Sequence, residues 1–570
     1  MKLKIYSLVL VFLIFAGCSE DLLDEETPHI LTGQSLYNSP AGFEAGINGL
    51  YAMVREEFTG RVSAGNNDGS NLTDDRSFVR SNRLRAEMFM SGTDNMVTNV
   101  QGPEFGELYE DFANEHNPFQ VGLEKCFIWL YQVVNAANTI INQAESRTDV
   151  SWPSDADRNY VVAEARAIRA WAFRHISYAW GDAPMPLVES TGSTIRNDWE
   201  RTPRSVIRRQ MINDWRFAEE IIPVEPVIES RMTKGAVQTY LAEIYLAIGK
   251  PDSALIWADK CINTSEYQLV TARYGVRANE PGVAFMDMFY SGNAKRSEGN
   301  TEALWIFEHE FGAEGGGGSI MRRWLVNRYD QIRVGGVSPF RFRIDRGGRG
   351  IARMQPTTFM FDLYEAQDDR YSDYAVKQFM VIKEEADHPQ GAPDRVPGGF
   401  SFGDTVFFDP GVVITPDTKR TRASYQRPYS RKYENLLPDN GLQEAFQWND
   451  LIYLRLADTY LLKAEAELKL GRTGNAANTI NVIRSRSNAT PISAGDVDID
   501  FILDERSREL FSEEHRRWTL VRTGKWLERV QLHNFNGGQT AAARDTIHPI
   551  PQLVIDANLG NAMPQNPGFN

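Results

Sequence analysis

Cysteine is scarce in this sequence, which has three such residues in 570. Cys18 follows an apolar N-terminal run, and Cys126 and Cys261 lie within apolar segments of helical periodicity. Cysteines in such segments usually act as small buried apolar side chains, and the sequence does not place these two together. We therefore expect two buried thiols, and a disulfide between them stays open as the alternative.

Positive charge is also in deficit. Lysine and arginine total 61 against 76 acidic residues, so the formal net charge is -15. Nucleic-acid binding needs a basic face that neutralises phosphates, so this balance argues against a nucleic-acid partner. No apolar stretch after Phe15 is long enough to cross a membrane. The remaining composition, 42% hydrophobic and 24% charged, is typical of a soluble globular protein with a large core.

Motifs of known catalytic and metal sites are missing from the sequence. HExxH, paired CxxC, P-loop and GxSxG patterns do not occur, and the eight histidines lack metal-ligand spacing. The segment 68–74 has oxygen ligands but misses the EF-hand pattern, so we expect a polar turn. We expect no enzyme activity, no cofactor and no metal. A glycosidase needs only two carboxylates about 5 to 9.5 Å apart, and that alternative stays open.

The N-terminus has the parts of a secretory signal. Lys2 and Lys4 form a basic start, an apolar run ends at Phe15, and two small residues precede Cys18. The run is too short to span a bilayer comfortably. A cysteine in this place resembles a bacterial lipobox, with Phe15 where leucine is usual. The sequence predicts a lipoprotein signal peptide over residues 1–17 and lipidation of Cys18; an ordinary secretory signal is the alternative.

An acidic segment follows the cysteine, and we assign residues 18–35 to a lipid-anchored tether. Its first residues include Glu20, Asp21, Asp24, Glu25 and Glu26. Such a cluster resembles the surface-export signal of Bacteroidetes lipoproteins. A tether that is merely solvated is the alternative.

Helical periodicity dominates both ends of the chain. Apolar residues recur at helical spacing over 122–144, 160–180 and 204–222, and the second stretch stops at a Gly-Asp-Ala-Pro sequence beginning at Gly181. Near the C-terminus, charged residues recur at spacings that permit ion pairs along one helix: Glu505, Arg506, Arg508, Glu509, Glu513 and Arg516. We expect these charges to shape the scaffold and not to perform acid–base chemistry.

An internal repeat links two of the helical segments at an offset of 222 residues. Ala242, Leu246, Gly249 and Ala254 correspond to Ala464, Leu468, Gly471 and Ala476. Small residues allow two antiparallel helices to approach closely, and the glycine ends the first helix, which is the logic of a tetratricopeptide hairpin. Pro251 fits the first turn of the second helix. The sequence therefore predicts a mostly α fold built on tetratricopeptide-like helical hairpins.

The middle of the chain differs in composition. From about Asn279 to Gln447 it is rich in glycine, proline and aromatic residues, with glycines at 315–318, 335–336, 347–348 and 350. Short strand-like runs occur at 303–307 and 404–408. We expect an irregular region of loops and short strands on the helical scaffold, where binding sites tend to lie.

Several segments, taken in order, match the motifs of one protein family. They are Ala163–Ala170 with Trp180–Pro184, Thr233–Ala236, Gln355–Thr357 with Asp369–Tyr371, Leu454–Ala466, Asp504–Trp518 with Leu520–Lys525, and His548–Pro551 with Gln565–Phe569. Tyrosine is common in the family where this chain has His548. Each motif is modest alone, but the ordered set resembles the SusD/RagB family over nearly the whole mature chain.

The resemblance implies a glycan-binding lipoprotein of the outer membrane, facing the cell exterior. Its implied partner is a TonB-dependent SusC-like transporter, to which it would deliver an oligosaccharide or polysaccharide without catalysis. Peptide or another nutrient as cargo stays open, as does a pure protein-interaction scaffold. Residues 36–570 then form one SusD-like domain, with an N-terminal helical part (36–278), a loop-rich part (279–447) and a C-terminal helical part with a docking tail (448–570).

Sugars offer apolar ring faces and hydroxyl groups, which aromatic and polar side chains match respectively. The candidate ligand contacts in the predicted loops are Arg323, Trp324, Asn327, Tyr329, Phe340, Phe400 and Phe402, with Asn67, Asp68 and Asp94 from the N-terminal loops. Trp324 stands out because it follows a glycine run that gives its loop room to present a side chain. For each aromatic residue, burial in the core is the alternative.

Overall fold

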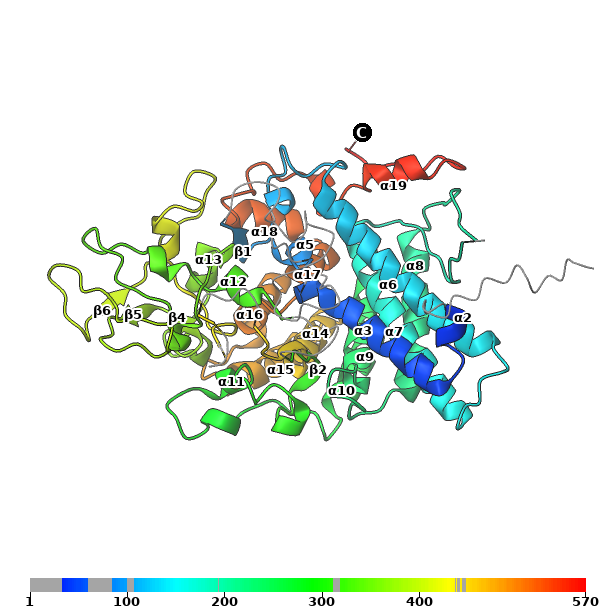
Figure 1. Ribbon diagram of the computed structural model, residues 1–570, viewed down its shortest axis with the longest axis horizontal. Helices are drawn as coiled ribbons and strands as arrows, with labels where there is room; N and C mark the ends of the chain where they lie inside the picture. Colours follow the sequence, from blue (N-terminus) through cyan, green and yellow to red (C-terminus); the bar gives the residue numbers. More distant parts are fainter. Residues whose placement is uncertain are drawn as a thin grey trace, which may run out of the picture.

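The protein is described by a computed structural model, which covers residues 33–59, 85–99, 107–192, 194–310, 318–435, 437, 441–442 and 447–569. Figure 1 shows three groups of elements along the longest axis. Long helices gather at one end, most of the shorter C-terminal helices lie in the centre, and strands connected by loops form the other end. Within the described residues, we find no helix with both the length and the apolar character needed to cross a membrane.

Four long helices form the first group: α3 (Pro40–Thr59), α6 (Val121–Ser146), α7 (Asp155–Ala179) and α8 (Arg204–Ile221). The helices predicted over 122–144, 160–180 and 204–222 are confirmed. Ser154 caps α7, since its hydroxyl accepts a hydrogen bond from the Asp157 amide at 3.2 Å. Gly181 then reverses the chain after α7 with a positive φ of 75°. Helix α7 is buried along most of its length and packs against the other three.

The repeated sequence forms two helical hairpins, as predicted. The first is α9 (Lys234–Ala247) with α10 (Pro251–Ile262), and the second is α14 (Leu456–Lys469) with α15 (Thr473–Arg486). Gly249 and Gly471 occupy equivalent turns, with φ of 71° and 72°. Ala242, Ala254 and Ala466 share one buried cluster, so the small residues bring the two hairpins against each other. The tetratricopeptide-like scaffold is therefore confirmed.

Helices α16 (Ile499–Leu510), α17 (Arg516–Thr523), α18 (Trp526–His533) and α19 (Gln552–Ala557) complete the C-terminal part. The charged residues predicted to pair along one helix do so only in part. Arg508 does pair with Glu505 at 2.7 Å, but α16 ends at Leu510. Glu513 lies beyond that end and bonds to Arg455 on another element, because most of these charges are buried and pair across the fold.

Two short antiparallel ladders lie within the loop-rich part, and two others join it to strands before and after it. The pairs are β1 (Met96–Thr98) with β3 (Met354–Pro356), β2 (Ala303–Phe307) with β8 (Leu451–Arg455), β4 (Val376–Lys377) with β7 (Tyr429–Ser430), and β5 (Phe379–Val381) with β6 (Thr405–Phe407). The strand-like runs at 303–307 and 404–408 are thus confirmed as β2 and β6. Single-turn helices lie around them or near the N-terminus: α2 (Gly33–Leu36), α5 (Glu87–Met90), α11 (Ala284–Asp287), α12 (Met321–Leu325) and α13 (Thr358–Asp362).

The loop-rich part has a small core of its own. Val326, Tyr329, Phe340 and Ala352 pack there with residues from the strands β5 and β7. The two cysteines behave as predicted, since Cys126 and Cys261 are both buried and free.

Candidate ligand-binding surface

The predicted contact residues fall into three groups by position. Cys18, Asn67 and Asp68 lie outside the described residues, so their predicted roles stay predictions. A second group is fully buried, and a third lies at or near the surface. The exposure of the residues in the last two groups shows which of the predicted contacts a ligand can reach.

Three of the five aromatic residues predicted to contact a ligand are buried and not exposed. Trp324 is 0% exposed and lies in α12, not in a loop, because its indole packs into the main core. Tyr329 is also 0% exposed, and its hydroxyl donates to the Gly348 carbonyl. Phe340 is 1% exposed within the smaller core. A sugar ring cannot stack on any of these faces as they lie here, so we do not carry them into the proposed site.

Two predicted polar contacts are also buried and already bonded. The Asn327 amide donates to the carbonyls of Tyr425, at 2.5 Å, and Arg427, at 2.9 Å. Asp94 accepts from Arg516 and Arg529, each at 2.6 Å. Burial by itself would raise the pKa of Asp94, but the two guanidinium groups outweigh it and hold that pKa below its usual range. These residues hold the fold together and are not available to a ligand.

Aromatic side chains do reach the surface at the strand pair β5–β6, the far end of the molecule in Figure 1. Phe407 is 73% exposed and Phe402 is 42% exposed. Phe379 faces Phe407 across the ladder, with 5.7 Å between the ring centroids. Phe400 is half-buried and packs against the smaller core. We call Phe379, Phe402 and Phe407 the aromatic surface; only Phe402 had been singled out in the sequence.

Phe407 and Phe379 could have been found from the strand pattern. A two-stranded ladder with no sheet packed beside it has a face in solvent, and cross-strand partners share that face. Exposed phenyl faces of this kind match the apolar faces of sugar rings.

Arginine side chains gather at a different part of the loop region. Arg323 lies in α12, and its carbonyl accepts from the Ile351 amide at 3.1 Å, which brings Arg353 and Arg349 alongside. Asn99 joins Arg353 to Arg420: its amide donates to the Arg353 carbonyl at 2.8 Å, and its Oδ1 accepts from the Arg420 amide at 2.9 Å. We call Arg323, Arg349, Arg353 and Arg420 the arginine surface.

Trp324 has a role at this surface that the sequence did not suggest. The guanidinium carbon of Arg353 lies 5.1 Å from the centroid of the indole ring. A guanidinium over an indole face is attracted by the ring electrons, so the buried tryptophan holds Arg353 in place. The Arg420 backbone has a positive φ of 56°, which costs a non-glycine residue about 1–2 kcal/mol.

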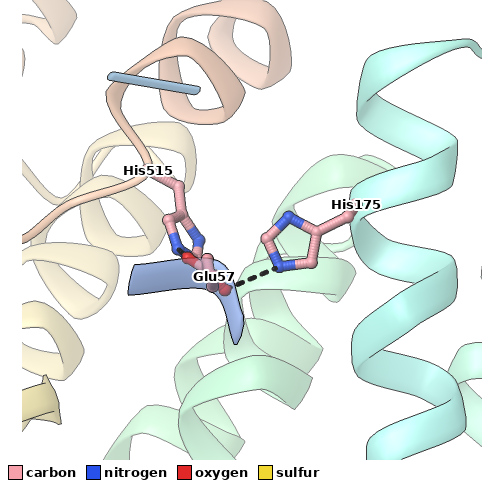
Figure 2. A group of neighbouring side chains, drawn as sticks. All are labelled: Glu57, His175 and His515. Atoms are coloured by element: carbon pink, nitrogen blue, oxygen red, sulfur yellow. Dashed lines mark hydrogen bonds and ion pairs between the residues drawn. The ribbon is translucent and has the colours of Figure 1, made fainter. Parts of the chain in front are cut away.

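Glu57, His175 and His515 form the one group among the described residues with ligand atoms close enough to suggest a metal. Figure 2 shows both imidazole rings turned toward the Glu57 carboxylate. His515 Nε2 lies 3.0 Å from Glu57 Oε1, and His175 Nε2 lies 4.0 Å from Oε2. The three residues come from separate elements: α3, α7 and the turn before α17.

The hydrogen bonds behind the rings decide against a metal. Trp518 Nε1 donates to His175 Nδ1 at 3.0 Å, and an Arg174 nitrogen donates to His515 Nδ1 at 2.5 Å. Each neutral ring must then hold its proton on Nε2, the atom that faces Glu57. A metal needs a lone pair there. Burial raises the pKa of Glu57 to about 8 and lowers the pKa of both histidines well below its usual value, so the group is a structural network.

Two family models match separate segments of the chain, together covering more than half of it. The model described as the SusD family matches residues 412–569, and the one described as starch-binding and associating with the outer membrane matches residues 30–246. SusD-like protein P2 of Formosa agariphila is 24% identical over the full length of both chains. Starch-binding protein SusD of Bacteroides thetaiotaomicron is 36% identical, over 21% of this chain and 22% of that one.

Solved structures share the fold. A laminarin-binding SusD-like protein has a TM-score of 0.63 at 18% identity, covering 93% of this chain and 99% of that one. Surface glycan-binding protein A from Bacteroides thetaiotaomicron, solved with laminarihexaose, gives the same TM-score, identity and coverage. A SusD homologue from Bacteroides thetaiotaomicron reaches a TM-score of 0.67 at 17% identity, over 94% and 98% of the two chains.

Proposed function

Because this chain belongs to the SusD/RagB family, we propose that it is a cell-surface glycan-binding lipoprotein of the outer membrane. It captures an oligosaccharide or polysaccharide and passes it to a TonB-dependent transporter. The names of its relatives support the glycan: one binds starch, and a structural neighbour holds laminarihexaose. The lipid on Cys18 and the acidic tether over 18–35 belong to the same proposal.

The aromatic surface is the observation that carries the glycan proposal in this chain. The ladder β5–β6 lies at the end of the molecule away from the long helices (Figure 1). Phe407, in β6, and Phe402, in the turn before it, are both exposed. Exposing such faces to water is unfavourable unless a partner covers them, and sugar rings offer apolar faces of matching shape. The rest of the small core, including Phe400, holds the ladder in place.

We propose binding without catalysis. One described pair of carboxylates that includes a raised pKa is Glu308 and Asp450, where burial raises the pKa of Asp450 to about 6. Both, however, contact one ammonium group: Lys295 Nζ lies 2.9 Å from Glu308 and 3.5 Å from Asp450. The shared lysine accounts for the two carboxylates as an ion-pair cluster.

Removing both exposed phenyl rings should weaken glycan binding. We expect the double variant Phe402→Ala, Phe407→Ala to bind a recognised glycan about thirtyfold less tightly, since an aromatic anchor contributes about 2 kcal/mol. The melting temperature should barely change, because both side chains are exposed. Titration calorimetry gives the affinity, and a thermal melt gives the stability.

The matched control is Phe535→Ala. Phe535 is 48% exposed but lies after α18, in the C-terminal part, so its loss should leave the affinity unchanged. Equal affinity of the double variant and the wild type for every glycan in the panel would contradict the assignment of the aromatic surface.

The transporter partner gives a prediction of its own. A binder held at a membrane by lipid cannot itself carry a glycan across, so a channel must take the cargo. Purification in mild detergent at native expression should recover a large β-barrel protein in near-equal amount. A strain with the untagged chain controls for binding to the resin. Recovery of this chain alone would count against the partnership.

A further inference from the structure

One stretch of the chain has a charge opposite to that of the whole. Between residues 319 and 356 there are nine arginines, no lysine, two aspartates and no glutamate, in a chain whose net charge is -15. Charge asymmetry of this kind indicates an interaction surface for a partner of the opposite sign. Of these nine arginines, Arg323 alone is among the candidate contacts.

Some of these arginines have structural roles. Arg346 pairs with Asp394 at 2.6 Å, and Arg343 pairs with Asp345 at 3.0 Å. Arg322 donates to the Gly347 carbonyl. These groups build the small core and its loops, so they are not part of the inference.

Three other arginines of this stretch lie close to Arg420, which is distant from them in the sequence. Arg323, Arg349 and Arg353 meet Arg420 through the backbone hydrogen bonds around Asn99 described above. Arg420 is exposed, Arg323 and Arg349 are half-buried, and Arg353 is 8% exposed. The four arginines thus range from exposed to nearly buried, and two of them, Arg349 and Arg420, can be changed without opening the core.

The charges act on one another. Burial, followed by repulsion from Arg323, Arg420 and Arg349, lowers the pKa of Arg353 to about 10, although Glu87 opposes this shift. Arg323 and Arg353 also make other interactions within the chain. The guanidinium groups of Arg323, Arg349 and Arg420 thus repel that of Arg353, and an anion bound among them would reduce this repulsion.

A neutral donor lies beside this surface, on Asn99, which bonds to the backbones of Arg353 and Arg420. Asn99 is 1% exposed, and its Nδ2 has no hydrogen-bond partner. An unsatisfied buried donor is costly, so a site that supplies an oxygen acceptor would relieve it. Sulfate and carboxylate oxygens accept from guanidinium and amide donors alike.

We propose that the arginine surface binds the anionic groups, sulfate esters or uronate carboxylates, of an acidic glycan. The inference rests on the proposed function and narrows its ligand class. The aromatic surface holds ring faces, and the arginine surface selects chains that carry negative charge. Because the chain as a whole is strongly negative, acidic glycans are repelled from most of its surface and are drawn to this region.

Native affinity electrophoresis of the whole secreted chain tests the inference with paired polymers. Dextran and dextran sulfate share a backbone, polygalacturonate supplies carboxylates, and polyglutamate is a polyanion without sugar. We expect retardation by dextran sulfate, polygalacturonate or both, and none by dextran. The retardation should weaken as sodium chloride is raised, because salt screens partly exposed charges. Which of the two acidic polymers binds identifies sulfate or carboxylate as the recognised group.

The variant is Arg349→Gln with Arg420→Gln, which leaves the two arginines with other interactions in place. It should bind the acidic polymer at least tenfold more weakly. The control is Arg209→Gln, which removes an exposed charge from α8 and should change nothing. A thermal melt shows whether the double variant folds; if it does not, Arg420→Gln alone, at an exposed position, gives the same comparison.

The outcomes separate the two proposals. Binding of neutral glycans only, or an acidic polymer bound equally by wild type and variant, overturns the inference and leaves the glycan-binding function standing. Equal retardation by polyglutamate supports an anion-binding surface but contradicts a glycan receptor. No retardation by any polyanion overturns the inference.

Discussion

Replacing Glu509 with alanine is expected to lower the free energy of unfolding by about 3–5 kcal/mol, the usual effect of removing one partner from a buried ion pair. Glu509 accepts from Arg455 at 2.5 Å, from Arg370 at 3.1 Å and from Arg486. All four side chains are buried. Without the carboxylate, three guanidinium groups lose a shared acceptor in the interior, where water cannot replace it.

Urea unfolding of Glu509→Ala and of a surface control measures this effect. The control is Glu528→Ala. The Glu528 side chain is 64% exposed and forms an i,i+3 ion pair with Lys525. Exposed pairs of this kind contribute about 0.5 kcal/mol or less. Equal stability of the two variants would show that the network around Glu509 does not hold α16 to the rest of the fold.

Acid should act on the same network. Burial by itself would raise the pKa of Glu509, but Arg486, Arg455 and Arg370 outweigh it and hold the pKa well below its usual value. A carboxyl with a lowered folded pKa stabilises the protein above its unfolded pKa and loses that effect as pH falls toward the folded one. Wild type should therefore lose stability below about pH 4, and the difference between wild type and Glu509→Ala should shrink there.

Replacing Cys18 with alanine is expected to abolish lipid labelling and membrane attachment. In the proposed lipoprotein the Cys18 sulfur takes the diacyl group, so no other residue is expected to substitute for it. Anchoring needs about two acyl chains, each buried methylene contributing about 0.8 kcal/mol, and the variant has none. Cells given labelled palmitate should yield labelled wild type, found with membranes, and unlabelled variant.

Cys261→Ala is the matched control for that labelling, because Cys261 is buried in the fold and free. It should keep both the label and the membrane attachment. A palmitate label that persists on Cys18→Ala would contradict lipidation at Cys18, and a wild type without label would indicate an ordinary secretory signal.

Much of the scaffold could be predicted because its determinants are local. Ala242, Gly249 and Pro251 each have a short-range reason to be where they are: close helix approach, a left-handed turn and a helix start. The repeat of this pattern after 222 residues predicted both hairpins. The strands at 303–307 and 405–407 could be predicted for the same reason. Both are short runs of branched and aromatic residues, and turn-forming residues lie on either side.

The candidate site was harder because burial is not a local property. Trp324 and Phe402 both follow glycine-rich segments, yet the first is 0% exposed and the second 42%. What separates them is the packing of α12 on the main core, which no spacing in the sequence encodes. The arginine surface shows the same limit: the excess of arginine is visible in the sequence, but its meeting with Arg420 depends on the hydrogen bonds of Asn99.

The central claim, binding of a glycan without hydrolysis, is tested most directly by titration of an oligosaccharide panel of neutral and acidic members, with product analysis after long incubation. The account predicts saturable binding of at least one glycan and no new reducing ends. Reducing ends that accumulate with wild type, and disappear in Glu308→Gln with Asp450→Asn, would show a glycosidase. Failure to bind any member of the panel, by protein that melts cooperatively, would contradict the account.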